Sequence, residues 1–264
     1  GDAAHRFPPT GGLGLNTGVQ DAHGLVWKLA AVEAGWAGRE ILETHGVERI
    51  PTAHNNTRQS LQNAVKIGLL AQALGTDQEP TSAQMHKRLS EPEGQAAVAA
   101  AVEEQRTHFD MLGLQLGYAY ESGALVPDGT PPPSEVSPSV FEPSARPGAR
   151  LPHAWLLPSA GNDEAARRSS LDLITSDAMT LLSFSEHEAW AVGAAAISGT
   201  PLLHHRIGID AVDAEGSWAA LCGLNEGGAL IVRPDQHVAA RFTSLPDSPE
   251  QALAAAFDQI LSQA

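Results

Sequence analysis

The sequence has 264 residues, of which 42% are hydrophobic, so it is long enough to bury a sizeable core. Asp and Glu number 31 against 16 Lys and Arg, and the formal net charge of −15 opposes binding to polyanions such as nucleic acid or an anionic membrane. The single cysteine, Cys222, excludes a disulfide within the chain, and no apolar run reaches the length of a membrane span. This composition is typical of a cytoplasmic enzyme.

The first half of the chain is predicted to be mostly helical. Residues 1–18 are rich in Gly and Pro and predict a loop leading into a helix that starts near Asn16 or Thr17. Apolar residues then recur at spacings of three and four, which predicts a buried helix face made of Val19, Ala22, Val26, Leu29 and Ala30. Further helices are expected at 38–49, from Pro51 to about Leu74 with Leu61, Val65, Leu69 and Leu74 inward, at 81–90 and at 93–110.

Residues 127–147 contain seven prolines and predict an extended connection, because proline fixes φ and lacks the backbone donor. Beyond Pro152, short β-type runs alternate with helical patterns. Strands are expected at 171–174, 179–184, 202–209, 229–232 and 237–241, with a hairpin turn at 234–236. Helices are expected at 186–197, 216–221 and 249–261. This order predicts a small α/β sandwich, so the whole chain is an α/β (α+β) mixture.

The Gly-rich opening is the clearest candidate for a binding site. Gly11, Gly12 and Gly14 allow the backbone to approach a ligand closely, and the N-terminus of the following helix presents free N–H groups. Such a terminus suits an anion or an electron-rich carbonyl. Asp2 adds a carboxylate that can accept hydrogen bonds from ligand hydroxyls. From the glycine spacing alone, a capped turn that binds nothing is an equally good interpretation.

The full motif is far more specific than the glycines. The run Gly1-Asp2-Ala3-Ala4-His5, followed by Pro8-Pro9, Gly11-Gly12-Leu13-Gly14-Leu15-Asn16, Gly18, Asp21-Ala22 and Trp27-Lys28-Leu29, resembles the second FAD motif of the class A flavoprotein monooxygenases. Phenol, chlorophenol and polyketide hydroxylases belong to this family. Later matches are Glu48-Arg49, Leu116-Gly117-Tyr118 with Tyr120 and Gly123, Arg146-Pro147-Gly148, Leu151-Pro152-His153, Gly228-Ala229-Leu230, Val232-Arg233-Pro234-Asp235 and His237-Val238.

The resemblance implies a division into three parts. Residues 1–126 would be the helical C-terminal part of the FAD-binding and substrate region, 127–149 a Pro-rich connection, and 150–264 a thioredoxin-like domain. The activity implied is hydroxylation of a phenolic or polyketide-like aromatic, with FAD as cofactor and with NAD(P)H and O2 as co-substrates. The thioredoxin-like domain is expected to lack redox activity, because it has no CxxC pair.

The resemblance also implies roles for individual residues. Asp2 would bind the ribityl chain of FAD, and Pro8 would lie beside the isoalloxazine ring and face the substrate pocket. The backbone of the segment Gly12, Leu13, Gly14, Leu15 and Asn16 would meet the pyrimidine edge of the flavin. The helix N-terminus there would favour the anionic reduced flavin by about 0.3–2 kcal/mol.

The family's Gly-x-Gly-x-x-Gly motif for the ADP part of FAD does not occur in this sequence. We therefore expect a fragment that holds little FAD by itself and needs an N-terminal FAD-binding half, from the same gene or from a separate chain. A homodimer is one option for the assembly. The alternatives are a non-catalytic thioredoxin-like binding or assembly module, and another flavoenzyme with the same motif, such as an epoxidase or oxidase. No metal site is expected, because the eleven histidines lack ligand spacing.

Overall fold

The computed structural model describes residues 1–76, 81–132, 137–159, 166–184 and 188–262. These residues form two compact units. Unit 1 consists of Gly1–Asp21, Ile50–Leu116 and Val136–Phe141, and unit 2 of Ala22–Arg49, Gly117–Glu135 and Glu142–Ala264. Both of the first two long helices therefore contribute to both units.

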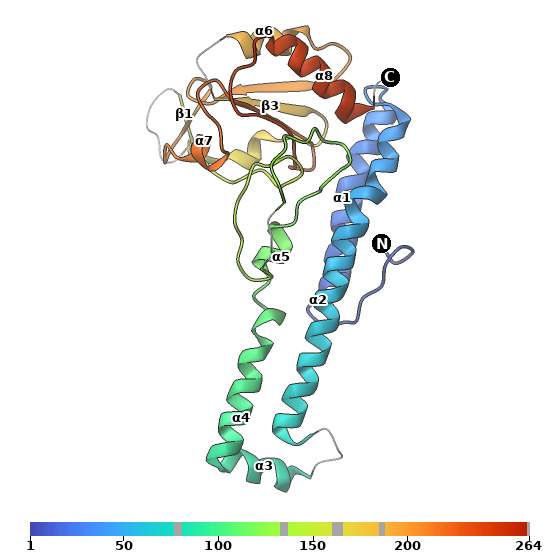
Figure 1. Ribbon diagram of the computed structural model, residues 1–264, viewed down its shortest axis with the longest axis vertical. Helices are drawn as coiled ribbons and strands as arrows, with labels where there is room; N and C mark the ends of the chain where they lie inside the picture. Colours follow the sequence, from blue (N-terminus) through green and yellow to red (C-terminus); the bar gives the residue numbers. More distant parts are fainter. Residues whose placement is uncertain (77–80, 133–136, 160–165, 185–187, 263–264) are drawn as a thin grey trace. The chain divides into compact units, whose positions relative to one another are not determined.

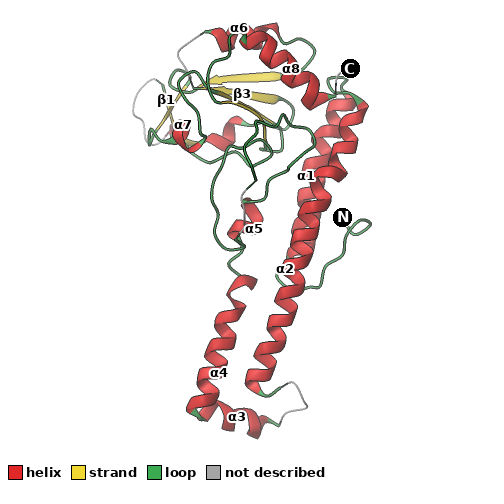
Figure 2. Ribbon diagram, viewed as in Figure 1, coloured by secondary structure: helices red, strands yellow, loops and turns green. Residues whose placement is uncertain are grey.

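Helices make up most of unit 1 (Figure 2). Helix α1 (Leu13–Glu33) follows the predicted loop and begins three residues before Asn16. Helix α2 (Thr44–Leu74) turns back through α3 (Ser82–Ser90) into α4 (Pro92–Glu103). The 3-10 helix η2 (Glu104–His108) and α5 (Leu112–Leu116) complete the unit. Gln105 connects η2 to α2, because its side chain donates to the Lys66 carbonyl at 2.8 Å.

The predicted break before Pro51 is wrong. A 3-10 helix, η1 (Arg39–Glu43), leads directly into α2, and Pro51 lies inside α2. Proline removes one backbone donor, and this 31-residue helix nevertheless continues past it.

The predicted inward faces of α1 and α2 are also wrong among the described residues. Val19, Val26 and Leu29 on α1 are exposed, as are Leu61, Val65 and Leu69 on α2. Helix α1 buries Thr17, Asp21 and Lys28 beside Leu13, Trp27 and Ala31. The buried residues of α2 are mainly polar or charged: Glu48, Arg49, Thr52, Asn56, Gln59, Ser60 and Asn63. The predicted apolar residues do lie on helices, but most of them are exposed in the part of the chain that the structure describes.

The core of unit 2 is a four-stranded mixed sheet with the order β4-β3-β6-β7. Strand β3 (Met179–Ser183) pairs parallel with β4 (Leu202–Arg206) and antiparallel with β6 (Ala229–Val232), which pairs antiparallel with β7 (Val238–Phe242). Helices α6 (Ala189–Ala196) and α8 (Pro249–Leu261) lie side by side over one face (Figure 1). A βαβ unit followed by a hairpin and a helix is the arrangement expected for a thioredoxin-like domain.

Alternation along the strands explains why both faces of this sheet are apolar. Leu181 and Ile231 pack with Trp190 of α6 and Phe257 of α8. Their neighbours on the other face pack around Trp218 of α7 (Trp218–Leu221). Each face is therefore covered by its own set of aromatic and aliphatic side chains.

Most of the predicted elements beyond residue 152 are confirmed. Strand β6 has the predicted bounds, and the other three strands of the large sheet agree to within a few residues. Residues 186–187 of one predicted helix lie outside the described residues. The strand predicted at 171–174 is wrong: Ser169 and Asp172 form a capping box that starts the 3-10 helix η4 (Ser170–Leu173).

A small antiparallel sheet was not predicted. It consists of β1 (Trp155–Pro158) between β2 (Arg168–Ser169) and β5 (Ala211–Asp213). Strands this short carry too few residues to show a period of two. Across the described ranges, no helix is both long and apolar enough to cross a membrane.

Candidate functional site

The Gly-rich loop ends in two glycines with left-handed backbone. Gly11 has φ +85° and Gly12 φ +65°, a region that other residues rarely adopt. A Cβ on Gly11 would lie 2.7 Å from Nδ2 of Asn63, so a larger residue would also collide with α2. No heavy atom lies within 4 Å of a Cβ built on Gly12. The loop therefore approaches α2 closely at Gly11 and is open to a ligand at Gly12.

The predicted contact segment continues into the first turn of α1. Leu13 is buried, whereas Leu15 is 80% exposed. Asn16 donates from Nδ2 to the Gly12 carbonyl at 2.8 Å, and Gly14 packs closely against the ring of Phe7. The first backbone N–H groups of a helix have no acceptor within the helix. This turn therefore combines an open glycine with a cluster of backbone donors.

Asp2 and Pro8 belong to the same loop, which is anchored at several points. Asp2 is exposed and Pro8 is half-buried. His5 contacts Asp21 of α1, with 2.6 Å between Nε2 and Oδ2. The carbonyl of Pro8 accepts a hydrogen bond from the hydroxyl of Ser60 at 2.8 Å. These anchors fix the start of the motif against α1 and its proline against α2.

The sequence analysis missed the residues of α2 that support this loop. Asn56, Ser60 and Asn63 are buried on one face of α2. Asn56 donates to Oγ1 of Thr17 at 2.8 Å, and Ser60 donates to the Pro8 and Thr10 carbonyls. The signal was present as short polar residues at spacings of four and three, the repeat of a helix face.

These features fit the flavin end of FAD. Backbone N–H groups at a helix N-terminus suit the carbonyl groups of a pyrimidine ring, and the exposed carboxylate of Asp2 can accept from ribityl hydroxyls. The open space at Gly12 leaves room for a planar ring close to the backbone. Across the described ranges, no three His, Cys, Asp or Glu residues are placed to hold a metal ion.

A separate ion cluster lies buried in unit 2. The guanidinium of Arg233 donates to Oε1 of Glu48 at 2.7 Å and to Oδ1 of Asp235 at 3.0 Å. Lys28 donates to Oε2 of Glu48 at 2.7 Å, and the indole of Trp27 donates to Asp235 at 3.1 Å. Glu48 and Arg233 are 185 positions apart in sequence, so the cluster connects distant segments within this unit.

The cluster shifts the pKa values of its carboxyl groups downward. Burial alone would raise the pKa of Glu48, but the charge and hydrogen bonds of Arg233 hold it below its ordinary value. In the same way, Arg233 and then His237 hold the pKa of Asp235 well below its usual range against the effect of burial. Both carboxyl groups are therefore ionised at neutral pH.

Cys222 should be unreactive in the folded protein. Its side chain is fully buried, and burial raises the pKa of the thiol to about 12. Because the thiolate is the nucleophile, we expect a thiol reagent at pH 8 to modify Cys222 at least about 100-fold more slowly in native than in urea-unfolded protein. Equal labelling rates in the two states would contradict this, and so would thiol–disulfide exchange by the native domain.

Two protein families match parts of the chain. Residues 1–60 match the FAD binding domain, and residues 144–264 match the aromatic-ring hydroxylase C-terminal domain. The first match contains the Gly-rich loop, the first turns of α1 and the segment of α2 that reaches Ser60. The second contains the four-stranded sheet with its helices.

Two relatives are monooxygenases named for phenols. The chain is 32% identical to phenol 2-monooxygenase of Pseudomonas sp. (strain EST1001), with 96% of this chain and 43% of that protein covered. It is 36% identical to 2,4-dichlorophenol 6-monooxygenase of Delftia acidovorans, with 99% of this chain and 46% of that protein covered. The chain thus spans less than half the length of these relatives.

Solved structures agree with the sequence matches. The flavin-dependent monooxygenase PieE, in complex with FAD and substrate, superposes with a TM-score of 0.88 at 34% identity, over 100% of this chain and 47% of that chain. Aklavinone-11 hydroxylase, in a ternary complex with FAD and aklavinone, gives 0.75 at 29% identity over 100% of this chain and 43% of that chain. The chain is therefore similar over nearly its whole length to FAD-dependent aromatic hydroxylases, and it spans less than half of theirs.

Proposed function

We propose that this chain supplies the flavin-ring end of the FAD site in a monooxygenase that hydroxylates a phenolic or polyketide-like aromatic. The observation that carries this proposal is the loop of residues 1–12 with α1: an open left-handed Gly12 directly before a helix N-terminus, with an exposed carboxylate at Asp2. The relatives named above act on phenols, and two solved neighbours hold FAD with a substrate.

Each loop residue has its own part in the proposed site. Asp2 accepts hydrogen bonds from the ribityl chain, and the backbone from Gly12 to Asn16 meets the pyrimidine edge. Leu13, Gly14 and Leu15 act there through their backbone N–H groups, because the side chain of Leu13 is buried and that of Leu15 points into solvent. Pro8 shapes the substrate pocket beside the ring.

The proposed reaction consumes two co-substrates, O2 and NAD(P)H. An aromatic C–H compound, O2, NAD(P)H and a proton give the phenol, water and NAD(P)+. FAD, when bound, supplies the redox chemistry, and the chain holds and orients the ring. The positive end of the α1 dipole at Gly12–Leu13 favours negative charge on the pyrimidine edge of the reduced ring.

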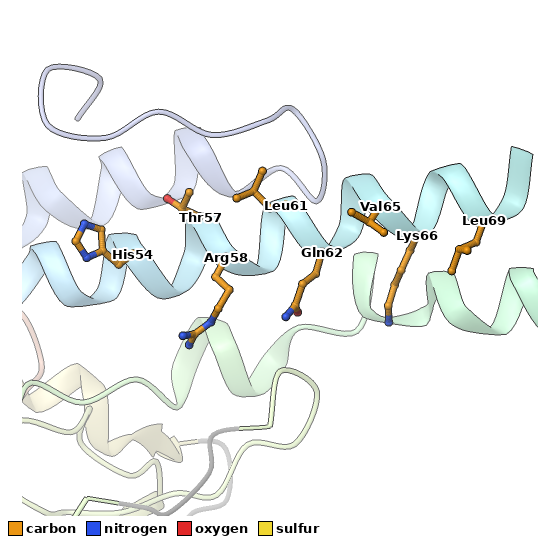
Figure 3. A pocket seen from close by; sticks show the side chains of 8 residues that line it. All are labelled: His54, Thr57, Arg58, Leu61, Gln62, Val65, Lys66 and Leu69. Carbon is orange, nitrogen blue, oxygen red and sulfur yellow. The ribbon is translucent and has the colours of Figure 1, made fainter. Parts of the chain in front are cut away.

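The proposed partner is the N-terminal FAD-binding half, whether in the same polypeptide or in another. In unit 1, α2 carries an open apolar pocket of about 650 Å³ along its exposed face, lined by His54, Thr57, Arg58, Leu61, Gln62, Val65, Lys66 and Leu69 (Figure 3). These residues lie away from the buried face that holds Ser60. Val65 is 69% exposed, and burying such a face against the partner would remove apolar surface from water. A cytoplasmic location and a homodimer remain predictions.

The proposal is tested by adding the FAD-binding half to the chain in trans. Flavin fluorescence titration should show tight FAD binding only for the mixture, and the mixture should form a hydroxylated product that contains oxygen from isotopically labelled O2. Val65→Glu should weaken the reconstitution, because it places a charge on the apolar face. A mixture that binds FAD but makes no hydroxylated product would favour the oxidase alternative, and one that binds no FAD would favour the non-catalytic module.

A further inference from the structure

We propose that Ser60 is a positioning residue: its hydroxyl sets the conformation of Pro8–Thr10 and thereby keeps hydroxylation coupled to NAD(P)H oxidation. The inference rests on the proposed function, since it concerns the same flavin-facing loop. Ser60 lies on α2, far from the motif in sequence, and is fully buried.

Four hydrogen bonds join Ser60 to the loop, one of them between its hydroxyl and that of Thr10 at 3.1 Å. Its Oγ lies 2.8 Å from the Pro8 carbonyl and 2.9 Å from the Thr10 carbonyl, so a single proton is shared between two acceptors. In return, the hydroxyl of Thr10 donates to the Ser60 carbonyl at 2.5 Å. The loop and the helix are thus joined in both directions at one residue.

Helix residues on either side of Ser60 lie against the part of the motif that follows Thr10. Four residues before it, Asn56 donates to Thr17, whose hydroxyl donates to the Leu13 carbonyl at 2.7 Å. Three residues after it, Asn63 has its Nδ2 at the position that a Gly11 side chain would occupy. Ser60 therefore holds Pro8–Thr10 directly before a stretch that approaches α2 closely at Gly11 and is bonded to it at Thr17.

The bonds to Ser60 determine which way the Pro8 peptide faces. Because the Pro8 carbonyl is directed to α2, the pyrrolidine ring is fixed in orientation relative to Gly12. Without the hydroxyl, two carbonyls lose their donor and the peptide is free to rotate. A shift of about 1 Å at a reacting centre can cost about 100-fold in rate. Oxygen would then leave as H2O2: NAD(P)H, O2 and a proton give NAD(P)+ and H2O2, with no phenol formed.

The test compares Ser60→Ala with Ser90→Ala in the chain completed by its FAD-binding half, loaded with FAD and assayed during turnover of an aromatic substrate. Ser90 is the matched control, because its hydroxyl is exposed and donates to the Lys87 carbonyl of its own helix. For Ser60→Ala we expect FAD to remain bound, a changed visible flavin spectrum, and a fall of about fivefold or more in product formed per NAD(P)H, the factor that matches one lost hydrogen bond. H2O2 should rise by the matching amount, and Ser90→Ala should leave both quantities unchanged.

An unchanged product-to-NAD(P)H ratio and flavin spectrum in Ser60→Ala would overturn the inference. If that variant does not fold, Ser60→Cys takes its place, because it keeps the size of the side chain and offers a weaker donor. A smaller fall in coupling is expected there, and no fall would overturn the inference. Failure of the proposed function is distinguishable, since the unmodified protein would then lack FAD binding or hydroxylation.

Discussion

Replacing Arg233 with methionine should lower the free energy of unfolding by about 3–5 kcal/mol, the cost of removing one partner from a buried ion cluster. Arg233 is fully buried and bonds both Glu48 and Asp235, and its guanidinium also lies 5.1 Å from the ring centre of Trp27. Methionine fills similar space but leaves two buried carboxylates without their main counter-charge. Urea unfolding measures the change.

The same cluster predicts how stability depends on pH. The folded-state pKa values of Glu48 and Asp235 lie below their ordinary values of 4.5 and 3.8. Their contribution to stability is therefore fully present above about pH 5 and is lost as the pH falls through the folded-state values. Stability measured between pH 7 and pH 3 should fall less steeply in Arg233→Met than in the unmodified protein, because the variant has already lost this contribution.

Two further variants show whether the loss of stability is specific to Arg233. Lys28→Met should cost less than Arg233→Met, because burial and the nearby charge of Arg233 lower the pKa of Lys28 to about 8 and leave its charge only weakly favoured at neutral pH. Arg206→Met is the surface control, since its pair with Asp210 is solvent-accessible and contributes little to stability. A loss below about 1 kcal/mol for Arg233→Met would contradict the assigned role.

Motif residues outside the Gly-rich loop turn out to have a structural role. Glu48-Arg49, Tyr118, Tyr120, Asp235 and His237 carried the resemblance from separate places in the sequence. In unit 2 they meet: Tyr120 stacks on His237 at 4.5 Å between ring centres, and the Arg49 guanidinium lies 5.4 Å from the ring centre of Tyr118. The Glu48–Arg233 pair in the same unit joins segments 185 positions apart, which no local pattern reveals, so the sequence could identify the motifs but not their common site.

Local signals predicted the parts of the fold that they determine directly. Glycine spacing predicted the loop before α1, and β-type runs predicted the strands of the large sheet. The prediction of which residues are buried failed where burial depends on segments distant in sequence. Helix α2 has an exposed apolar stripe with Leu61 and Val65 and a buried polar stripe with Asn56 and Ser60. The rule that an amphipathic helix buries its apolar face predicts the opposite. The polar stripe is buried because it carries hydrogen bonds to the loop.

Replacing Asp2 with alanine should weaken FAD binding by about 10- to 150-fold once the chain is completed by its FAD-binding half. The change removes an ionised acceptor for ligand hydroxyls, worth about 1.5–3 kcal/mol. Asp2 is exposed in the loop of residues 1–12, so the substitution removes no buried packing, and the thermal stability of the protein without FAD should stay the same.

Flavin fluorescence titration measures this loss, and Asp258→Ala is the matched control. Asp258 is an exposed carboxylate on α8, so its removal changes the net charge by the same amount without touching the loop. A general electrostatic effect on the anionic cofactor would strengthen binding slightly in both variants, because each removes one negative charge from a chain of net charge −15. A direct contact to the ribityl chain weakens binding in Asp2→Ala alone. The opposite signs separate the two causes, and unchanged or tighter binding in Asp2→Ala would remove this residue from the proposed site.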